Sequence, residues 1–233
     1  MMMNLYLYSA ELTSSLKGYV MPNKLSNDIP DIVIGRLPLY LRALTRLHQD
    51  GAEVTSSHEL GQHLGISSAQ IRKDLSLFGG FGKQGTGYQI EYLINKLQDV
   101  LQVNRVWNVA VVGAGDLGSA IAHYRGFEDR GFRICWLFDA DPTKIGKQVA
   151  NFAILPMAEI ERVIHENACQ IAMIAVPAEH AQSVADVLIK AGVRSILNYA
   201  PINLNVPEHV MVQYIDPVVH LQHMTFYLRE TNK

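Results

Sequence analysis

The sequence predicts an α/β protein with an N-terminal winged helix-turn-helix domain and a doubly wound parallel-sheet (Rossmann) domain. Three observations support this prediction. Ser67–Phe78 has the pattern of a DNA-recognition helix, the glycine-rich stretch Gly79–Tyr88 has the composition of a wing, and Val109–Gly118 has the strand–glycine–helix pattern of a dinucleotide site. Each motif alone is weak, but together they indicate a chain that couples a nucleotide to DNA.

Length and composition bound the possibilities. The 233 residues suffice for one large or two modest domains, and 48% hydrophobic with 18% charged residues excludes bulk disorder. A net charge of −2 argues against a uniformly basic nucleic-acid binder but leaves room for a local positive face. No apolar run approaches the roughly 18 residues of a membrane span, so we expect no membrane partner. The simplest setting for the two cysteines, Cys135 and Cys169, is a reducing cytoplasm.

Residues 1–28 are predicted to be a flexible N-terminal extension. Leu5–Tyr8 is too short for the apolar region of a signal peptide, and Met21 is a second candidate start. Cys135 and Cys169 lie in apolar, strand-like stretches, which favours two buried thiols in a reducing compartment over a disulfide or redox pair.

Residues 29–104 are assigned to the winged-helix domain and its linker helix. Leucines at helical spacing predict a helix over residues 36–48, ended by Gly51. Ser56 and Glu59 have the spacing of a capping box that starts a short helix, which Gly65 ends. Ser67 and Gln70 repeat the pattern and start a third helix, which gives the helix-turn-helix plan.

The third helix is predicted to enter the major groove. Ile71, Leu75 and Phe78 form one apolar stripe that faces the core, and Lys83 is the cation of the predicted wing. The residues expected to contact DNA are Ser67, Ser68, Gln70, Arg72, Lys73, Ser76 and Lys83. The alternative is a small helical interaction domain with a solvated Arg-Lys pair. An amphipathic helix over residues 91–103 then leads to the domain boundary near Asn104–Arg105.

Residues 105–216 are assigned to the dinucleotide-binding domain. The predicted strand Trp107–Val112 runs into Gly113-Ala114-Gly115-Asp116-Leu117-Gly118, which opens a helix over residues 119–124. Gly113 permits the tight turn, Gly115 lets the backbone approach the pyrophosphate, and Gly118 lets the helix pack on the strand. The N-terminus of the helix then faces the phosphates. Asp139 ends the next strand, 21 residues after Gly118, where a carboxylate binds the adenosine ribose. This carboxylate favours NAD(H) over NADP(H), although Lys144 lies close in sequence.

The remaining segments continue the alternation of strand and helix. Helices are expected over residues 157–165 and 179–191, and strands over 171–176, 195–198 and 210–214. The ends of two of these strands should build the nicotinamide side, with Val176, Pro177, Asn198 and Tyr199, joined by Tyr124. An apolar and aromatic pocket penalises the positive charge of NAD⁺, so NADH is the predicted effector and NAD⁺ competes.

Residues 217–233 are assigned to a C-terminal dimerisation helix. Asp216-Pro217 starts a helix that is apolar around most of its circumference, so it needs burial on several sides. The alternatives are packing on its own domain and insertion between two subunits, since winged-helix readers usually work as twofold dimers.

The chain resembles the Rex family of bacterial redox-sensing transcriptional repressors from about Ile29 to its C-terminus. The resemblance rests on Gln70–Ser76 with Phe78-Gly79 and Phe81–Lys83, on Gly113–Gly118, on Tyr124–Phe127, on Phe138–Pro142 with Lys144–Gly146, and on Ile196–Pro201. It implies a homodimer that exchanges C-terminal helices, binds a palindromic operator when NADH is scarce, and releases it when NADH binds.

The resemblance also suggests an interdomain switch. Arg42 would pair with Asp216 of the partner subunit in the DNA-bound form, while Tyr124 and Tyr199 sense the nicotinamide; a plain surface role for Arg42 is the alternative. Three features depart from the family pattern: residues 1–28, Tyr199 in place of a more usual Phe, and the segment Val219–Gln222, which lacks an acidic residue.

Two other functions are compatible with parts of the sequence. An NAD-dependent dehydrogenase would need a general acid or base beside the nicotinamide, and none of the histidines sits in a recognisable catalytic constellation. The helix-turn-helix would also have no role in a dehydrogenase. The second function, a cofactor-binding interaction module without DNA contact, is excluded if the protein shifts a labelled operator. We therefore predict a regulator with no catalytic residues and no metal site.

Overall fold

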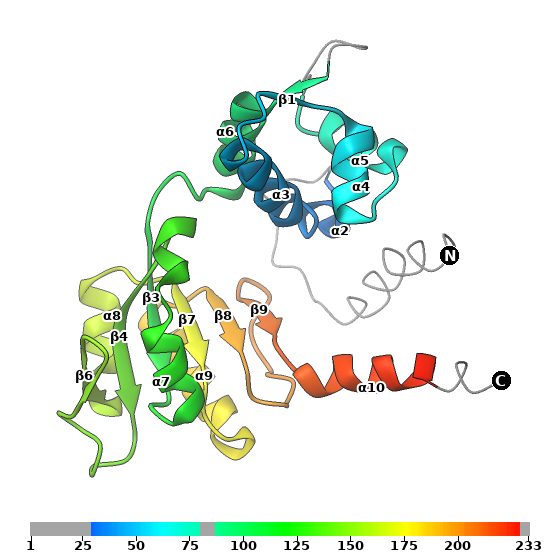
Figure 1. Cartoon of the computed structure of the whole chain (residues 1–233). Coiled ribbons are helices and arrows are strands. Elements are labelled where there is room, and N and C mark those ends of the chain that lie inside the picture. Colours follow the sequence, from blue (N-terminus) through cyan, green and yellow to red (C-terminus); the bar gives the residue numbers. More distant parts are fainter. Residues whose placement is uncertain (1–28, 80–86, 229–233) are drawn as a thin grey trace. The chain divides into compact units, whose positions relative to one another are not determined.

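The computed structural model describes residues 29–79 and 87–228, which form two compact units divided between Arg105 and Val106 (Figure 1). The first unit is mainly helical. Its elements are α2 (Asp31–Ile34), α3 (Leu37–Gln49), β1 (Val54–Thr55), α4 (Ser57–Leu64), α5 (Ser68–Ser76), β2 (Tyr88–Gln89) and α6 (Ile90–Leu101).

The apolar stripes predicted from the sequence build the core of this unit. Leu44 of α3, Leu60 of α4, Ile71 of α5 and Leu93 of α6 are fully buried and belong to one cluster. Phe78 is half-buried against the same cluster. Four amphipathic helices therefore share one interior, and the polar faces of α4 and α5 are left outside.

Two glycines shape the helix-turn-helix. Gly65 ends α4 in the left-handed region at φ +67°, which a residue with a Cβ rarely adopts. A Cβ at Gly61 would lie 2.5 Å from the carbonyl oxygen of Ile66, so only glycine lets the turn pack against α4. After α5, Tyr88–Gln89 pairs antiparallel with Val54–Thr55. Most of the predicted wing, Lys83 included, lies outside the described residues.

The second unit is a seven-stranded sheet. Its strands are β3 (Trp107–Val112), β4 (Phe132–Asp139), β5 (Gln148–Val149), β6 (Phe152–Pro156), β7 (Ile171–Ile174), β8 (Ser195–Asn198) and β9 (Met211–Tyr214). The order across the sheet is β5-β6-β4-β3-β7-β8-β9, and only β5 is antiparallel to its neighbour. The chain leaves β3 toward β4 and later returns to β7 on the other side, so the topological switch point lies between β3 and β7.

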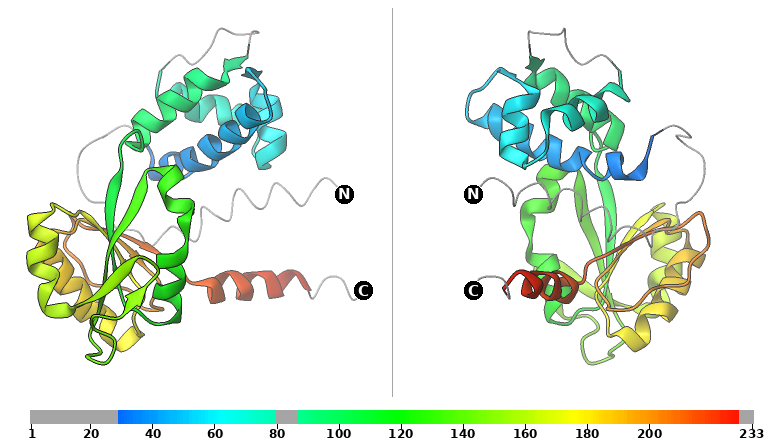
Figure 2. Two further views of the ribbon diagram at one scale, coloured as in Figure 1. Left: turned by 60° about the vertical axis from the view of Figure 1, so that its left-hand side comes forward. Right: turned by 90° about the vertical axis from the view of Figure 1, so that its right-hand side faces the viewer.

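Helices cover both faces of this sheet (Figure 2). α7 (Asp116–His123) and the 3₁₀ helix η1 (Arg125–Arg130) pack on the side of Val109 and Val111. α8 (Ile160–Glu166), preceded by η2 (Met157–Glu159), and α9 (Ala178–Ala191) pack on the side of Ala110 and Val112. Successive side chains of β3 therefore point to opposite faces of the sheet and belong to two different hydrophobic cores, as expected for a strand buried on both faces.

The predicted elements agree with the observed ones except at a few places. α7 begins at Asp116 rather than at Ser119, and the sequence did not indicate β5 or β6. The last helix, α10 (Pro217–Leu228), buries no side chain in this chain, and Leu221, Met224 and Phe226 are 59–65% exposed. None of the helices in the described ranges is long and apolar enough to cross a membrane.

Candidate functional site

The recognition helix α5 begins at a serine cap, as the sequence predicts. Ser67 Oγ accepts a hydrogen bond from the Gln70 backbone N–H at 3.2 Å, and Ser56 Oγ caps α4 in the same way through Glu59 at 3.1 Å. The reciprocal half of each capping box is absent. The Glu59 carboxylate accepts from the Thr55 hydroxyl, and the Gln70 amide bonds elsewhere.

The outer face of α5 carries exposed polar side chains. Arg72 and Lys73 are exposed, as the sequence predicts for DNA-facing residues, and Arg72 Nη1 donates to Ser57 Oγ at 3.0 Å. Ser76 is exposed too, and its hydroxyl donates to the Lys73 carbonyl, while Ser68 is half-buried. This face holds two cations at the major-groove helix of the motif, which is the local positive surface that DNA binding needs.

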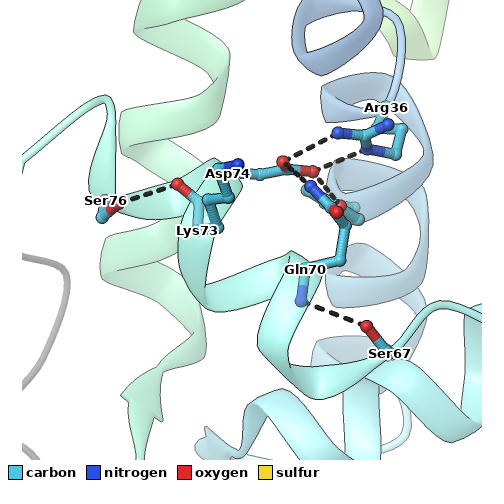
Figure 3. Close-up of polar contacts among 7 residues, drawn as sticks. Arg36, Ser67, Gln70, Lys73, Asp74 and Ser76 are labelled. Atoms are coloured by element: carbon cyan, nitrogen blue, oxygen red, sulfur yellow. Dashed lines mark hydrogen bonds and ion pairs between the residues drawn. The ribbon is translucent and has the colours of Figure 1, made fainter.

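A buried ionic network lies beneath α5 (Figure 3). Asp74 has no exposed surface and accepts from Arg36 Nε at 2.6 Å and Nη2 at 2.8 Å. The Tyr40 hydroxyl donates to Asp74 Oδ2 at 2.6 Å, and Gln70 Nε2 donates to Oδ1 at 2.7 Å. The carboxylate therefore accepts four hydrogen bonds, three of which join α5 to the start of α3 and one of which, from Gln70, lies within α5.

The protonation states of this network follow from its geometry. Burial disfavours the charged carboxylate, but the hydrogen bonds from Arg36, Tyr40 and Gln70 outweigh burial and hold the pKa of Asp74 below its ordinary value. Burial and the bond to Asp74 raise the pKa of Tyr40 well above its ordinary value. The network is therefore an ion pair with a neutral phenol.

Sequence reasoning missed Arg36, Tyr40 and Asp74. The available signal was an acidic residue inside the apolar stripe of α5, three residues after Ile71, together with Arg36 and Tyr40 one turn apart at the start of α3. A charged residue on a core face requires a buried partner, so this pattern predicts an ion pair.

The glycine loop after β3 has the shape that a pyrophosphate requires. Gly113 has φ +103°, and a Cβ there would collide with the Ala175 carbonyl oxygen; a Cβ at Gly118 would collide with the Gly113 carbonyl oxygen. At Gly115, in contrast, nothing among the described residues lies within 4 Å of the Cβ position. The first and third glycines are thus required by packing, whereas the second faces open space where a ligand can approach.

The start of α7 completes the phosphate side of this loop. Asp116 and Leu117 are exposed in the first turn of the helix, where backbone N–H groups have no intrahelical acceptor, and Ala114 is buried behind them. These N–H groups and the positive end of the helix dipole suit an anionic ligand.

Asp139 ends β4 beside this loop. Its Oδ2 accepts from the Ala114 N–H at 2.7 Å and from Lys144 Nζ at 3.1 Å, and its Oδ1 accepts from the Asp141 N–H at 2.8 Å. Burial opposes ionisation, but these three donors hold the pKa of Asp139 below its ordinary value. A carboxylate offers about four acceptor positions, so one remains for a ribose hydroxyl. The residues present thus fit an adenosine dinucleotide.

The ends of β7 and β8 lie next to each other across the sheet. Val176 is half-buried and Pro177 is exposed after β7, and Tyr199, half-buried after β8, donates its backbone N–H to the Ile174 carbonyl. Asn198 is fully buried, and its side-chain amide is hydrogen-bonded to the backbone of Ala200 and Ile202, so its place on the nicotinamide side stays a prediction. We therefore expect Asn198 to shape this loop while Tyr199 supplies the apolar surface.

Tyr124 follows α7 and is 51% exposed. Its ring meets Phe127 edge-on with centroids 5.0 Å apart, and Arg130 Nη1 donates to its hydroxyl at 3.3 Å. A Cβ at Gly126 would lie 2.5 Å from that hydroxyl oxygen, so the Tyr124 ring fits in this position because residue 126 has no side chain.

The two residues of the predicted switch lie in different units. Arg42 is exposed on α3, and Asp216 Oδ1 accepts from the Val218 N–H at 2.9 Å, which caps α10. Their pairing between subunits remains a prediction.

Both cysteines in the described part of the chain are free thiols. Cys169 is buried with its pKa raised to about 11 by burial, and burial also raises the pKa of the half-buried Cys135. Within the described ranges, no group of three or more His, Cys, Asp or Glu side chains could hold a metal ion.

Comparisons with known protein families divide the chain in the same way. Residues 28–76 match a family described as "Putative DNA-binding protein N-terminus", and residues 104–202 match one described as "CoA binding domain". Coenzyme A and NAD share an adenosine diphosphate moiety, so the second match agrees with the shape of the glycine loop.

Curated relatives and solved structures cover most of the chain. The redox-sensing transcriptional repressor Rex of Chloroflexus aggregans is 54% identical over 87% of this chain and 96% of its own length, and that of Streptomyces coelicolor is 45% identical over 88% and 80%. The structure of RSP with NAD⁺ and operator DNA matches with TM-score 0.83 and 36% identity over 88% of this chain and 95% of that one. RSP with NADH matches with TM-score 0.80 and 34% identity over 88% and 97%.

Proposed function

Because the chain belongs to the Rex family of redox-sensing transcriptional repressors, we propose that it represses transcription from a palindromic operator and releases that operator when NADH binds. One observation carries the proposal: a capped recognition helix and a glycine loop with open space at Gly115 occur in the same chain. The complexes of RSP, with operator DNA and NAD⁺ and with NADH, support both ligands.

Arg72, Lys73 and Ser76 are proposed to contact DNA from the exposed face of α5, with Lys83 on the wing. Ser67 is engaged in capping, so its contribution is to hold the helix N-terminus in place. Since the target is bacterial DNA, the site of action is the cytoplasm.

NADH is proposed as the effector, with NAD⁺ as its competitor. Gly113–Gly118 would hold the pyrophosphate and Asp139 the adenosine ribose. The nicotinamide would meet the aromatic and apolar surface of Tyr124, Val176 and Tyr199, which disfavours a charged ring because burial of an unpaired charge is costly.

The chain is proposed to act as a homodimer through α10. This helix buries no side chain here, yet carries six large apolar residues that are 48–65% exposed: Val218, Val219, Leu221, Met224, Phe226 and Leu228. Such a surface is typical of an interface, and exchange of α10 between two copies would cover it.

A dehydrogenase is the alternative that the dinucleotide fold alone would allow. The curated relatives are transcriptional repressors, which are regulators rather than enzymes. Hydride-transfer assays with candidate alcohols and acids should therefore detect no turnover of NADH.

Operator binding at varied NADH/NAD⁺ ratio tests the proposal directly. An operator is first selected from random DNA with the full chain, and its affinity is then measured by fluorescence anisotropy at fixed total cofactor. We expect the affinity to fall as the NADH fraction rises. An affinity independent of the ratio would refute redox sensing, and failure to select any sequence would refute operator recognition.

A further inference from the structure

Gln70 lies in the first turn of α5, the part of a recognition helix that contacts base edges in helix-turn-helix proteins. Its Nε2 donates to Asp74 Oδ1 at 2.7 Å (Figure 3). An ionised carboxylate only accepts hydrogen bonds, so the amide nitrogen has to face it. Turning the amide over would set two acceptor oxygens against each other.

Asp74 itself is held in a single orientation. Arg36 donates to both carboxylate oxygens, at 2.6 and 2.8 Å, and Tyr40 adds a third bond to Oδ2. The side chain of Asp74 is completely buried. The direction of the Gln70 amide is therefore fixed through Asp74 by Arg36 and Tyr40, which lie at the start of α3 and not on α5.

The carbonyl oxygen of Gln70 is left as a free acceptor. Across residues 29–79 and 87–228, Oε1 has no hydrogen-bond donor, and no side-chain nitrogen or oxygen there is both buried and unpartnered. Since Gln70 is only half-buried, Oε1 has to be open to solvent. An oriented acceptor that is open to solvent thus lies in the first turn of α5, the part of the helix expected to meet base edges.

We propose that Asp74 is a positioning residue that fixes the Gln70 amide so that Oε1 accepts a hydrogen bond from an exocyclic amine in the major groove. Adenine N6 and cytosine N4 are the amines presented there. The inference deepens the proposed function, because it requires α5 to read the operator. A network that only fastened α5 to α3 would support all operator sequences equally.

The test compares base preferences rather than total affinity. Wild-type chain and three variants are titrated against the selected operator and against a panel in which each base pair of the half-site is replaced in turn. Gln70→Met removes the amide at similar size, Asp74→Asn removes the charge that orients it, and Tyr40→Phe removes one bond to Oδ2 while leaving the Gln70 contact to Oδ1 intact.

We expect wild type and Tyr40→Phe to disfavour replacement of one adenine or cytosine by about tenfold, and Gln70→Met and Asp74→Asn to lose this preference at the same position. The identity of the lost base distinguishes adenine from cytosine. Uniform weakening by Asp74→Asn with the preference retained, or a full set of preferences in Gln70→Met, would overturn the inference while leaving operator binding standing.

If Asp74→Asn fails to fold, an NMR measurement on the wild-type protein tests whether Asp74 holds the Gln70 amide. In ¹⁵N-edited NMR spectra, the side-chain NH₂ pair of Gln70 is identified by its disappearance in Gln70→Met. We expect it to exchange with water more slowly than the pair of the exposed Gln62. Equal exchange rates would contradict an amide held by Asp74. If wild type binds no operator, the proposed function and this inference fail together.

Discussion

Substitution of the second glycine should separate cofactor binding from folding. At Gly115, with φ −82° and ψ −165°, the backbone is in a region open to any residue, and no described atom lies within 4 Å of the Cβ position. Gly115→Ala should therefore change the free energy of unfolding by no more than about 0.5 kcal/mol. The added methyl group occupies the space where the pyrophosphate approaches the backbone. Loss of one charge-assisted hydrogen bond costs about 1.5–3 kcal/mol, which is at least tenfold in the Kd for NADH.

Gly118→Ala is the matched control, with the same change three residues further on. Its methyl group would collide with the carbonyl oxygen of Gly113, so α7 has to shift and the free energy of unfolding should fall by about 1–3 kcal/mol. Urea unfolding measures the first quantity and calorimetry with NADH the second. Wild-type affinity in Gly115→Ala would refute the placement of the pyrophosphate at this glycine.

The further predictions concern the network, the DNA face, the switch and the effector. Arg36→Met leaves the Asp74 carboxylate buried without its cation and should lower the free energy of unfolding by about 3–5 kcal/mol in urea melts. Because folding lowers the pKa of Asp74, the contribution of this carboxylate to the free energy of unfolding is complete above its ordinary pKa of 3.8 and is lost as the pH falls through the lowered value. A wild-type stability that does not change over this acidic range would contradict this. Arg72→Ala/Lys73→Ala should abolish operator binding and leave the Kd for NADH unchanged, and retained operator affinity would exclude α5 as the reader. Asp216→Ala should weaken operator binding without weakening NADH binding, and Asp216→Asn, which can still cap α10, separates the charge from the cap. NADH should bind at least tenfold more tightly than NAD⁺, a difference of about 1.4 kcal/mol that equal calorimetric affinities would rule out.

The sequence predicted best those features that depend on residues close together in the chain. Ser56 and Ser67 cap their helices as expected, because an N-cap depends only on residues three apart in the chain. The parallel sheet and the position of Asp139 beside the glycine loop likewise follow from strand–helix alternation and from the spacing of the motif, whereas β5 and β6 were not predicted.

The features that the sequence did not reveal depend on residues distant in the chain. The Gln70 side chain leaves the capping box because its Nε2 donates to Asp74 instead, and Asp74 is available only because Arg36, 38 residues earlier, makes its burial possible. Asn198 was predicted to help build the nicotinamide side because it ends a strand, and the sequence did not show that its amide is bonded to the backbone of Ala200 and Ile202. Spacing in the sequence locates a residue at a strand end but does not give the direction of its side chain.

The contacts of Asp139 have a consequence for the entropy of cofactor binding. A free side chain that becomes ordered on association loses about 0.5–1.5 kcal/mol of rotamer freedom. The Asp139 carboxylate is already held at both oxygens by Ala114, Asp141 and Lys144, so its freedom is lost when the chain folds rather than when the ribose arrives. The adenosine end of a dinucleotide would therefore meet a preorganised surface, and the free energy of binding there would remain available for changes elsewhere in the protein.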